Sequence, residues 1–453
     1  MIKFFMQSAF LFSFFILLAA SPSFADDPNW KENQQELFDQ MGLYPGDVIN
    51  TDNWQKVKGL IPEPMVMWVK EGKIIMNIGE FKFDGSDDAP WENYGSKHNI
   101  DKYSIDEDGT LVEAATGKPP KWVYGYPFPQ IDFENDPDAG IKLTNNRDIN
   151  MGRDGSFKAP FSTEWIGKKG FERALSCELY RYNFWGTKTT EQFKNTDDLL
   201  FKEITLVQAP YDMAGTAQLT IRKTDGTEDQ LYVYIPAIRR TKRMSGANRS
   251  DPYLGSDFTV DDGNGWLGHT SSMEWKYIEE RIGLMCIAKG CAEKATTMKK
   301  EPDGRWLSGE SVADIKTGWQ IEGSTQAPWS LASAIWVPRK FYVVEAIPKD
   351  PYYNMGRMVF WIEKKILWSQ YKLMWDIAGE YWKTGIMTFQ FMKWKNQTTH
   401  AGNIQLCYDK KTDHATVLRA ARENILGKGK PFEFDISNNL KQFSVSRLGT
   451  LTK

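Results

Sequence analysis

This chain of 453 residues contains few of the side chains that most enzymes use for catalysis. It has four histidines and four cysteines, and no two histidines stand at the spacing of metal ligands. It lacks a G-x-S-x-G nucleophile turn, an H-E-x-x-H zinc motif, a G-x-x-x-x-G-K-[ST] phosphate loop and a G-x-G-x-x-G turn after a strand. We therefore expect no enzyme activity, no metal and no cofactor. Paired carboxylates for glycoside hydrolysis stay open, because such residues meet in space and not in sequence.

Long apolar runs are also absent after the N-terminus. The first 25 residues contain one lysine, an apolar run from Phe10 to Ala20 and the small-x-small site Ser23-Phe24-Ala25, which is typical of a secretory signal peptide. We predict cleavage after Ala25, and no cysteine near this site could carry a lipid anchor. Downstream, no uncharged run reaches the roughly 18 residues of a membrane-spanning helix. The pattern predicts a soluble exported protein of a Gram-negative periplasm.

A strong excess of one charge sign is missing as well. The formal net charge is −3 over 453 residues, so nothing in the composition indicates a nucleic-acid partner. Aromatic residues, in contrast, make up 14% of the chain, with 18 Trp, 18 Tyr and 26 Phe. Such a surplus fits a protein that encloses an apolar ligand, but a large β core absorbs aromatic residues equally well.

The four cysteines all follow the predicted cleavage site. Cys286 and Cys291 lie in MCIAKGCAE, where Lys289-Gly290 could form a turn between them. In an oxidising compartment this spacing favours a small disulfide loop. Cys177 and Cys407 would then form a second pair by elimination. The alternative is that the thiols are buried and free.

Helix signals stand at the start of the chain and strand signals through most of the rest. Helices are predicted over Asn29–Gly42 and Thr51–Ile61, and a third over Thr412–Gly427. Alternating β-branched and aromatic residues predict an antiparallel meander in the C-terminal half, and Asp225-Gly226 is a hairpin signal. The predicted strand regions are Lys73–Phe83, Ala217–Ile235, Arg357–Asp376 and Glu380–Lys395.

Residues 84–146 differ from the rest in composition. Proline, glycine and aspartate dominate there, which indicates a loop-rich insertion. We therefore predict a single domain over residues 26–453 that carries this insertion, after a cleaved signal peptide at 1–25.

One stretch, YIPAIRRTKRM…GSDFTVDD at Tyr234–Asp262, resembles the central signature of bacterial outer-membrane lipoprotein-sorting families. Within the same group, the segments at Gly46–Gly72, Gly125–Pro129 (GYPFP) and Ala139–Asn146 (AGIKLTNN) resemble the exported bacterial domain-of-unknown-function family 1329. The segment Tyr342–Trp368 matches its later part in kind. The resemblance thus covers most of the chain.

The resemblance implies a mainly β fold with helices: a curved, unclosed antiparallel half-barrel with helices on its concave face, as in the Lol-type lipoprotein carriers. Such carriers hold acyl chains in an apolar hollow and have no catalytic residues. The resemblance also implies a membrane transporter of the resistance-nodulation-division type or an outer-membrane acceptor as partner. This chain is longer than those carriers, which puts the ligand more in question than the fold.

The basic cluster at the end of this strand has a physical interpretation. On a strand, Tyr232 and Tyr234 face the opposite side from their neighbours, so one side could line a cavity. Pro236 cannot donate to the sheet and would end the strand. Guanidinium groups bind two oxygen atoms at once, which suits carbonyls, carboxylates and phosphates. The basic side chains expected at the rim are Arg239, Arg240, Lys242, Arg243 and Arg249.

Three uses of these side chains compete. They could bond to backbone ends of lid helices and hold a cavity shut, meet an anionic head group or acidic partner, or pair with nearby aspartates such as Asp261 and Asp262. The residues predicted to bind a ligand or to latch a lid are Tyr232, Tyr234, Arg239, Arg240, Arg243, Asp257 and Phe258.

Two functions from different classes follow. The first is a periplasmic carrier or chaperone that shields a lipid or a lipoprotein acyl chain on its way to the outer membrane. It predicts a concave sheet lined by Leu, Ile, Val, Met and Phe without clustered carboxylates. The alternative is a glycan-binding or glycan-processing protein, which predicts a cleft with an exposed tryptophan beside two carboxylates.

Overall fold

The structure is a computed structural model of the chain. It describes residues 34–82, 94–95, 97–152, 155–186, 195–245, 249–309, 311–394, 397–420, 423–424, 427–428, 431–436 and 442–451. The predicted signal peptide at 1–25 lies outside these residues and stays a prediction, as do the domain bounds 26–453. Within the described ranges, no helix is both long and apolar enough to cross a membrane.

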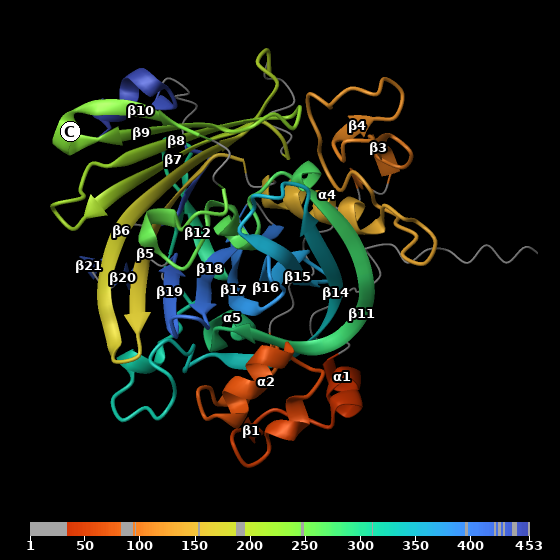
Figure 1. Cartoon of the computed structure of the whole chain (residues 1–453), viewed down its shortest axis with the longest axis vertical. Coiled ribbons are helices and arrows are strands. Elements are labelled where there is room, and N and C mark those ends of the chain that lie inside the picture. Colours follow the sequence, from red (N-terminus) through yellow and green to blue (C-terminus); the bar gives the residue numbers. More distant parts are fainter. Residues whose placement is uncertain are drawn as a thin grey trace, which may run out of the picture.

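A long, strongly curved antiparallel sheet forms most of the molecule (Figure 1). Its strands follow the spatial order β10-β9-β8-β7-β6-β5-β19-β18-β17-β16-β15-β14-β11. Strands β14 to β19 are consecutive neighbours, which confirms the predicted C-terminal meander. The bounds are β5 Phe157–Gly167, β6 Gly170–Asn183, β7 Leu199–Ala209, β8 Ala217–Lys223, β9 Gln230–Ile235, β10 Arg240–Met244, β11 Met273–Ile287, β14 Ile335–Pro348, β15 Met355–Glu363, β16 Trp368–Asp376, β17 Tyr381–Trp394, β18 Gln397–Asp409 and β19 His414–Arg419.

Three short strands close part of this sheet into a ring. β12 (Thr296–Lys300) runs parallel to β17, β13 (Trp306–Ser308) pairs with β12, and β22 (Glu433–Phe434) pairs with both β13 and β5. Together with β17, β18, β19 and β5 these three strands make a closed, mixed barrel of seven strands. The predicted unclosed half-barrel is therefore wrong, although the mainly β composition with helices is confirmed. Closure pairs backbone groups of β5 and β17 that an open sheet would leave without partners.

Both faces of the central meander are buried. Along β14, Phe341 and Val343 belong to one apolar cluster, whereas Tyr342 and Val344 belong to a second cluster on the opposite face. Side chains of a strand alternate between faces, so a sheet covered on both sides needs apolar residues at successive positions. Much of the aromatic surplus in the sequence is explained by these two cores.

The helices differ from two of the predictions. Helix α1 (Gln34–Met41) ends before Gly42, as expected. The helix predicted at Thr51–Ile61 is wrong, because only Trp54–Val57 forms a 3-10 turn (η1) there. The next helix, α2 (Glu63–Lys70), instead follows a proline. Proline is tolerated at the start of a helix because the first backbone N–H groups have no partner within the helix, so the N–H that proline lacks is not needed there.

The late helix predicted at Thr412–Gly427 is also wrong. Residues His414–Arg419 form β19, which hydrogen-bonds to β18 on one side and to β5 on the other. Two neighbouring strands satisfy its backbone groups and cover Ala415 and Val417, so tertiary pairing overrides the helical signals. The short strands β20 (Glu423–Asn424) and β21 (Gly427–Lys428) follow it.

The described part of the 84–146 insertion contains a small hairpin and the start of a helix. Strand β3 (Tyr103–Ile105) pairs with β4 (Leu111–Glu113). Helix α4 (Ala139–Gly152) takes in the last residues of the predicted loop region and packs on β11. Two further short strands, β1 (Val48–Ile49) and β2 (Met76–Ile78), join the main sheet through β14.

The space within the curve of the sheet is occupied mainly by residues 249–272 and not by long helices (Figure 1). This segment contains the 3-10 turns η5 (Tyr253–Gly255), η6 (Val260–Gly265) and η7 (Thr270–Ser272), and η6 lies on β16, β17 and β18. Helices α1 and α2 contribute to the first apolar cluster, and α4 to the second. The expected row of helices across the concave face is therefore replaced by this segment together with α4.

No disulfide is present among the four cysteines, all of which are buried and free. Cys286 lies in β11 and Cys291 in the short helix α5 (Lys289–Glu293), where its thiol donates to the carbonyl of Val312. Cys177 lies in β6, while the Cys407 thiol in β18 donates to the carbonyl of Asp257. Burial raises the pKa of each thiol, so all four are held as apolar core residues. The predicted pairs are thus corrected to free thiols.

Candidate functional site

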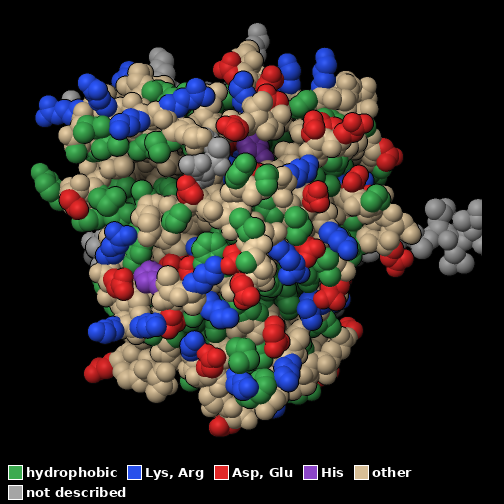
Figure 2. Space-filling view, in the orientation of Figure 1, with side chains coloured by type: hydrophobic (Ala, Val, Ile, Leu, Met, Phe, Trp, Pro, Cys, Tyr) green, Lys and Arg blue, Asp and Glu red, His purple; other side chains and the backbone are tan. Residues whose placement is uncertain are grey.

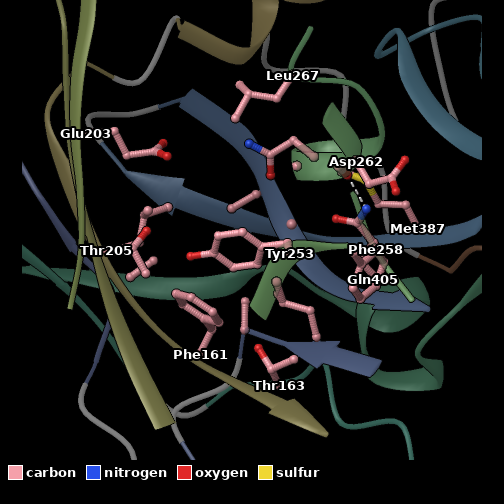
Figure 3. Close-up of a pocket in the computed structure, with 18 of the residues that line it drawn as sticks. Phe161, Thr163, Glu203, Thr205, Tyr253, Phe258, Asp262, Leu267, Met387 and Gln405 are labelled. Carbon is pink, nitrogen blue, oxygen red and sulfur yellow. Dashed lines mark hydrogen bonds between the residues drawn. The ribbon is translucent and has the colours of Figure 1, made fainter. Parts of the chain in front are cut away.

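A cavity with a volume of about 210 Å³ lies between strands β5 to β8, strand β18 and residues 249–267 (Figure 3). We call it the main cavity. The Tyr253 ring projects into it, between Thr205 and Phe258 (Figure 3). For comparison, a dry cavity of about 150 Å³ in another protein holds benzene. The main cavity therefore has room for a short apolar segment of a ligand.

One end of the main cavity is apolar. Every second residue of β5 faces it, because strand side chains alternate. Phe432 and Phe434 contribute aromatic rings to this end from the side of the barrel. The apolar lining consists of Phe157, Ala159, Phe161, Leu179, Leu418, Ala420, Phe432 and Phe434.

Polar side chains also line the main cavity. They include Glu203, Asp229 and Asp262 together with threonine, asparagine and glutamine side chains. Among the described residues, Asn150 Oδ1 and Asn403 Oδ1 have no hydrogen-bond donor, although both atoms are buried. A buried acceptor without a partner is costly, so these two oxygens favour a ligand or water that donates to them. The predicted lining of Leu, Ile, Val, Met and Phe alone is thus corrected to one that combines apolar and polar side chains.

Each carboxylate that lines the main cavity has a cationic partner. Asp262 accepts from Lys372 Nζ at 2.5 Å, and Glu203 from Arg181 at 3.2 Å. Burial raises the pKa of Glu203, although Arg181 opposes this shift. Asp229 is bound by two arginines, described next. None of the three is therefore a free carboxylate that could act as a general acid or base.

Asp229 is the centre of a buried ion-pair network. Its carboxylate accepts two bonds from Arg222, at 2.8 and 2.7 Å, and one from Arg249 at 2.5 Å. His269 Nε2 lies 3.0 Å from the same carboxylate, and Arg249 also pairs with Asp261. Burial alone would raise the pKa of Asp229, but Arg222, His269 and Arg249 outweigh it and hold this pKa far below its usual range.

The same two arginines hold residues 261–269 over the cavity. Arg222 Nη2 donates to the carbonyl of Leu267 at 2.5 Å, and Arg249 Nη2 donates to it at 2.9 Å. A capping box between Thr259 and Asp262 starts the 3-10 turn in this segment. Arg222 thereby attaches this segment to β8, whereas Arg249 bonds within residues 249–272 themselves. These are contacts of the kind predicted for a latch, but they come mainly from residues outside the predicted set.

The predicted tyrosines do not face the main cavity. Tyr232 and Tyr234 are half-buried and pack against a small apolar cluster under the C-terminal turn η10 (Val445–Thr450). A Cβ atom at Gly449 would lie 2.9 Å from the Tyr234 ring, which shows how closely this turn covers the strand. A ligand-binding role for the two tyrosines stays a prediction, because neither of them lines the main cavity.

The predicted arginines lie away from the cavity as well. Arg239, Arg240 and Arg243 are exposed, and none has an ion pair with another described residue. They lie on and before β10, which pairs only with β9 among the described strands and so ends the sheet. Figure 2 shows Lys and Arg side chains gathered over this edge, at the upper left. Charged residues on an exposed edge strand discourage pairing with other chains, which is sufficient reason for their presence.

Asp257 and Phe258 are brought to the sheet's inner side. Phe258 is buried and lines the main cavity. Asp257 accepts from Thr416 at 2.7 Å, and its carboxylate lies 2.6 Å from His414 Nδ1. Lys383 donates to the backbone carbonyl of Asp257 at 2.7 Å. Asp257 therefore anchors the start of the covering segment to β19 and β17.

We expect Asp257→Asn to lower the pKa of His414 toward its ordinary value of about 6.5. The hydrogen bond to Asp257 raises this pKa, burial opposes it, and Glu172 adds to the rise. Because the folded-state pKa is raised, the stabilisation is fully present below about pH 6.5 and is lost as pH rises through the folded-state value. An NMR titration of the His414 ring measures the change.

Glu172→Gln is the matched control for this titration. Glu172 Oε2 lies 3.4 Å from His414 Nε2 and its side chain is 56% exposed, so removing its charge should lower the His414 pKa less than Asp257→Asn does. An unchanged His414 pKa in Asp257→Asn would contradict the assigned hydrogen bond.

The sequence reasoning missed Arg222, Asp229 and Lys372. Arg222 and Thr220 are buried polar residues at alternate positions of β8, next to the buried Leu219. The alternation of polar and apolar residues along this strand was the available signal. A strand with one solvent-exposed face shows the same alternation. Only the fold reveals that this face is enclosed.

The comparisons with known proteins concern family and fold. The chain matches the model of a family described as a protein of unknown function, DUF1329, over residues 48–448. No curated protein matches it. A structure of a putative outer membrane lipoprotein-sorting protein domain from Vibrio parahaemolyticus is similar at 16% identity and a TM-score of 0.47, with 69% of this chain and 100% of that chain covered.

Two further solved structures are similar. A DUF1329 family protein from Desulfovibrio piger has 15% identity and a TM-score of 0.45, with 69% of this chain and 100% of that chain covered. A LolA superfamily protein from Nitrosomonas europaea has 11% identity and a TM-score of 0.37, with 66% and 94% covered. Because the family model extends over most of the sequence, and as the motifs around residues 46–72 and 125–146 indicated, this chain belongs to the DUF1329 family of proteins of unknown function.

Proposed function

We propose that this protein is a carrier that binds the hydrophobic part of an amphipathic ligand, such as a lipid or a lipoprotein acyl chain, in the main cavity. The observation that carries the proposal is the cavity itself, about 210 Å³ in volume and lined by both aromatic and polar side chains. Each buried methylene contributes roughly 0.8 kcal/mol, so a segment of about six methylenes would gain about 5 kcal/mol. The volume suits one such segment and not a complete lipid.

The ion pairs at the cavity argue against the glycan alternative. A glycosidase needs one carboxyl group that gives up a proton and a second one that is free to attack or to activate water. Asp229, Glu203 and Asp262 are each bound by arginine or lysine. Trp368, which also lines the cavity, is 1% exposed and offers no open face to a sugar ring. The arrangement therefore supports binding without catalysis.

The location and the route of this carrier come from the sequence. The predicted signal peptide supports a periplasmic protein, and delivery toward the outer membrane is part of the same proposal. A resistance-nodulation-division transporter as loading partner rests on the family resemblance alone. A pull-down from a periplasmic extract with the tagged protein would identify the partner.

The first test is native mass spectrometry of the protein purified gently from a periplasmic extract. We expect an added mass that denaturing extraction releases as a phospholipid, a fatty acid or an acylated peptide. An unliganded mass that persists after incubation with membrane lipids would contradict the carrier. In that case a glycan-binding screen would test the alternative.

A further inference from the structure

A second, smaller cavity lies beside the main cavity and is lined by cationic side chains. Its volume is about 50 Å³, and it shares Asn264 and Leu267 with the main cavity. Arg147 comes from α4, Arg181 from β6 and Arg222 from β8. Three elements that are distant in sequence thus direct arginines to one place.

The three arginines are buried and held in place. The side chains of Arg147, Arg181 and Arg222 are 2%, 8% and 5% exposed. The guanidinium groups of Arg181 and Arg222 lie 3.9 and 5.0 Å from the centre of the Phe201 ring. Each arginine has a carboxylate partner, namely Asp148, Glu203 and Asp229 respectively, and Asp148 also lines the second cavity. The ion pairs fix the orientation of the arginines and offset most of their charge.

Hydrogen-bond donors in this lining have no acceptor. Arg147 Nε, Trp185 Nε1 and Trp266 Nε1 are buried and without a partner among the described residues, and all three side chains line the second cavity. No buried side-chain acceptor of this lining is left unpaired in the same way. A buried N–H without an acceptor loses its hydrogen bond to water and gains nothing in return. The lining therefore presents hydrogen-bond donors that a ligand rich in acceptor atoms could satisfy.

We propose that the second cavity binds a small oxyanion, with phosphate or carboxylate chemistry. An ordered water occupies roughly 10–15 Å³ of such a volume, so the cavity has room for about four water-sized atoms, which is close to the size of a phosphate group. Planar guanidinium groups and indole N–H groups are suitable donors to such oxygens. The oxyanion is either a free ion or the head group of the ligand in the main cavity, and only the second case rests on the proposed function.

The test is a titration of the full-length mature protein with inorganic phosphate at constant ionic strength, followed by thermal unfolding and by isothermal calorimetry. We expect saturable binding that raises the Tm. Trp185→Phe removes one N–H donor and keeps the aromatic ring, so it should weaken phosphate binding at least tenfold. Trp319→Phe is the matched control, because Trp319 Nε1 is also buried and unpartnered but lies outside this cavity. No saturable phosphate binding, or equal losses in both variants, would overturn a free-ion site.

A second titration distinguishes the source of the oxyanion. Dodecyl phosphate and dodecanol share an alkyl chain and differ in the anionic head. If the site takes the head group, dodecyl phosphate binds more tightly than dodecanol, and Trp185→Phe removes the difference. If phosphate does not bind and the anionic head of dodecyl phosphate does not add to its affinity, the proposal of an oxyanion site is wrong. Tight binding of dodecanol alone would in that case still support the carrier, so the two proposals fail separately.

Discussion

Replacing Asp229 with asparagine is expected to lower the free energy of unfolding by about 3–5 kcal/mol. The Asp229 side chain is completely buried and accepts from Arg222, Arg249 and His269. The carboxamide keeps the shape but removes the negative charge, so two buried guanidinium groups lose their shared counter-ion. Urea unfolding, followed by tryptophan fluorescence, measures the loss.

Glu228→Gln is the matched control, since it makes the same change of charge one residue earlier. Glu228 is exposed, and surface substitutions of this kind usually stay within about 0.5 kcal/mol. Equal stability of Asp229→Asn and Glu228→Gln would show that the network around Asp229 contributes little.

The depressed pKa of Asp229 gives this prediction a pH dependence. A carboxylate whose folded-state pKa lies below the unfolded value of about 3.9 stabilises the fold above that pH, and the contribution is lost as pH falls below it. The wild-type protein should therefore lose more stability between neutral and acidic pH than Asp229→Asn does. Parallel slopes of the two stability curves below about pH 4 would contradict this assignment.

Replacing Ala159 with tryptophan is expected to reduce binding of the hydrophobic ligand at least tenfold. Ala159 lies on β5, is 7% exposed and faces the apolar end of the main cavity. An indole ring at this position occupies space that the ligand needs. Because the ring enters an existing cavity, the cost to stability should stay at the lower end of the roughly 1–3 kcal/mol seen for overpacked cores.

Displacement of a fluorescent fatty acid measures this effect, and circular dichroism reports whether the fold persists. Thr297→Trp is the control, because Thr297 is exposed on the barrel strand β12 and lies outside the lining of the main cavity. A folded Ala159→Trp protein that binds the probe as tightly as Thr297→Trp would exclude the main cavity as the binding site.

Several local features followed from the sequence. The hairpin predicted around Asp225-Gly226 forms between β8 and β9, with Gly226 at a φ of +73° that a side chain rarely adopts. The predicted two-residue turn is wrong, because β8 ends at Lys223 and β9 begins only at Gln230. The strand region predicted at Arg357–Asp376 becomes two strands, β15 and β16, which are joined by a turn. Both are short-range signals, in which a turn and its two strands lie within about twenty residues.

The errors share a physical cause. Residues Ala415–Arg419 carry helical signals, yet they pair with Ser162–Ile166, about 250 residues earlier in the chain. Barrel closure depends on two-residue pairings such as Thr296–Thr297 with Met392–Lys393. Such short strands have no periodicity that could be read, and their partners are far away along the chain.

The site shows the same division. Phe258 was identified, and it lines the main cavity, whereas the exposed arginines of β10 do not. The basic and acidic residues of Arg249–Asp262 could be recognised as a group. Which of these charges pair with each other could not be predicted. Arg249 pairs with Asp229, and the β8–β9 hairpin places Arg222 beside the same carboxylate.

By itself the sequence determined the mainly β composition, the C-terminal meander and the family, because alternation and local motifs are properties of neighbouring residues. The tertiary structure alone decided that the barrel closes, that the cysteines stay free, and that Arg222 and Arg249 hold residues 261–269 over a cavity lined by apolar and polar side chains. These features depend on contacts between residues far apart in the chain. Their energies come from burial and from paired charges, which exist only once the sheet has curved around the segment that it encloses.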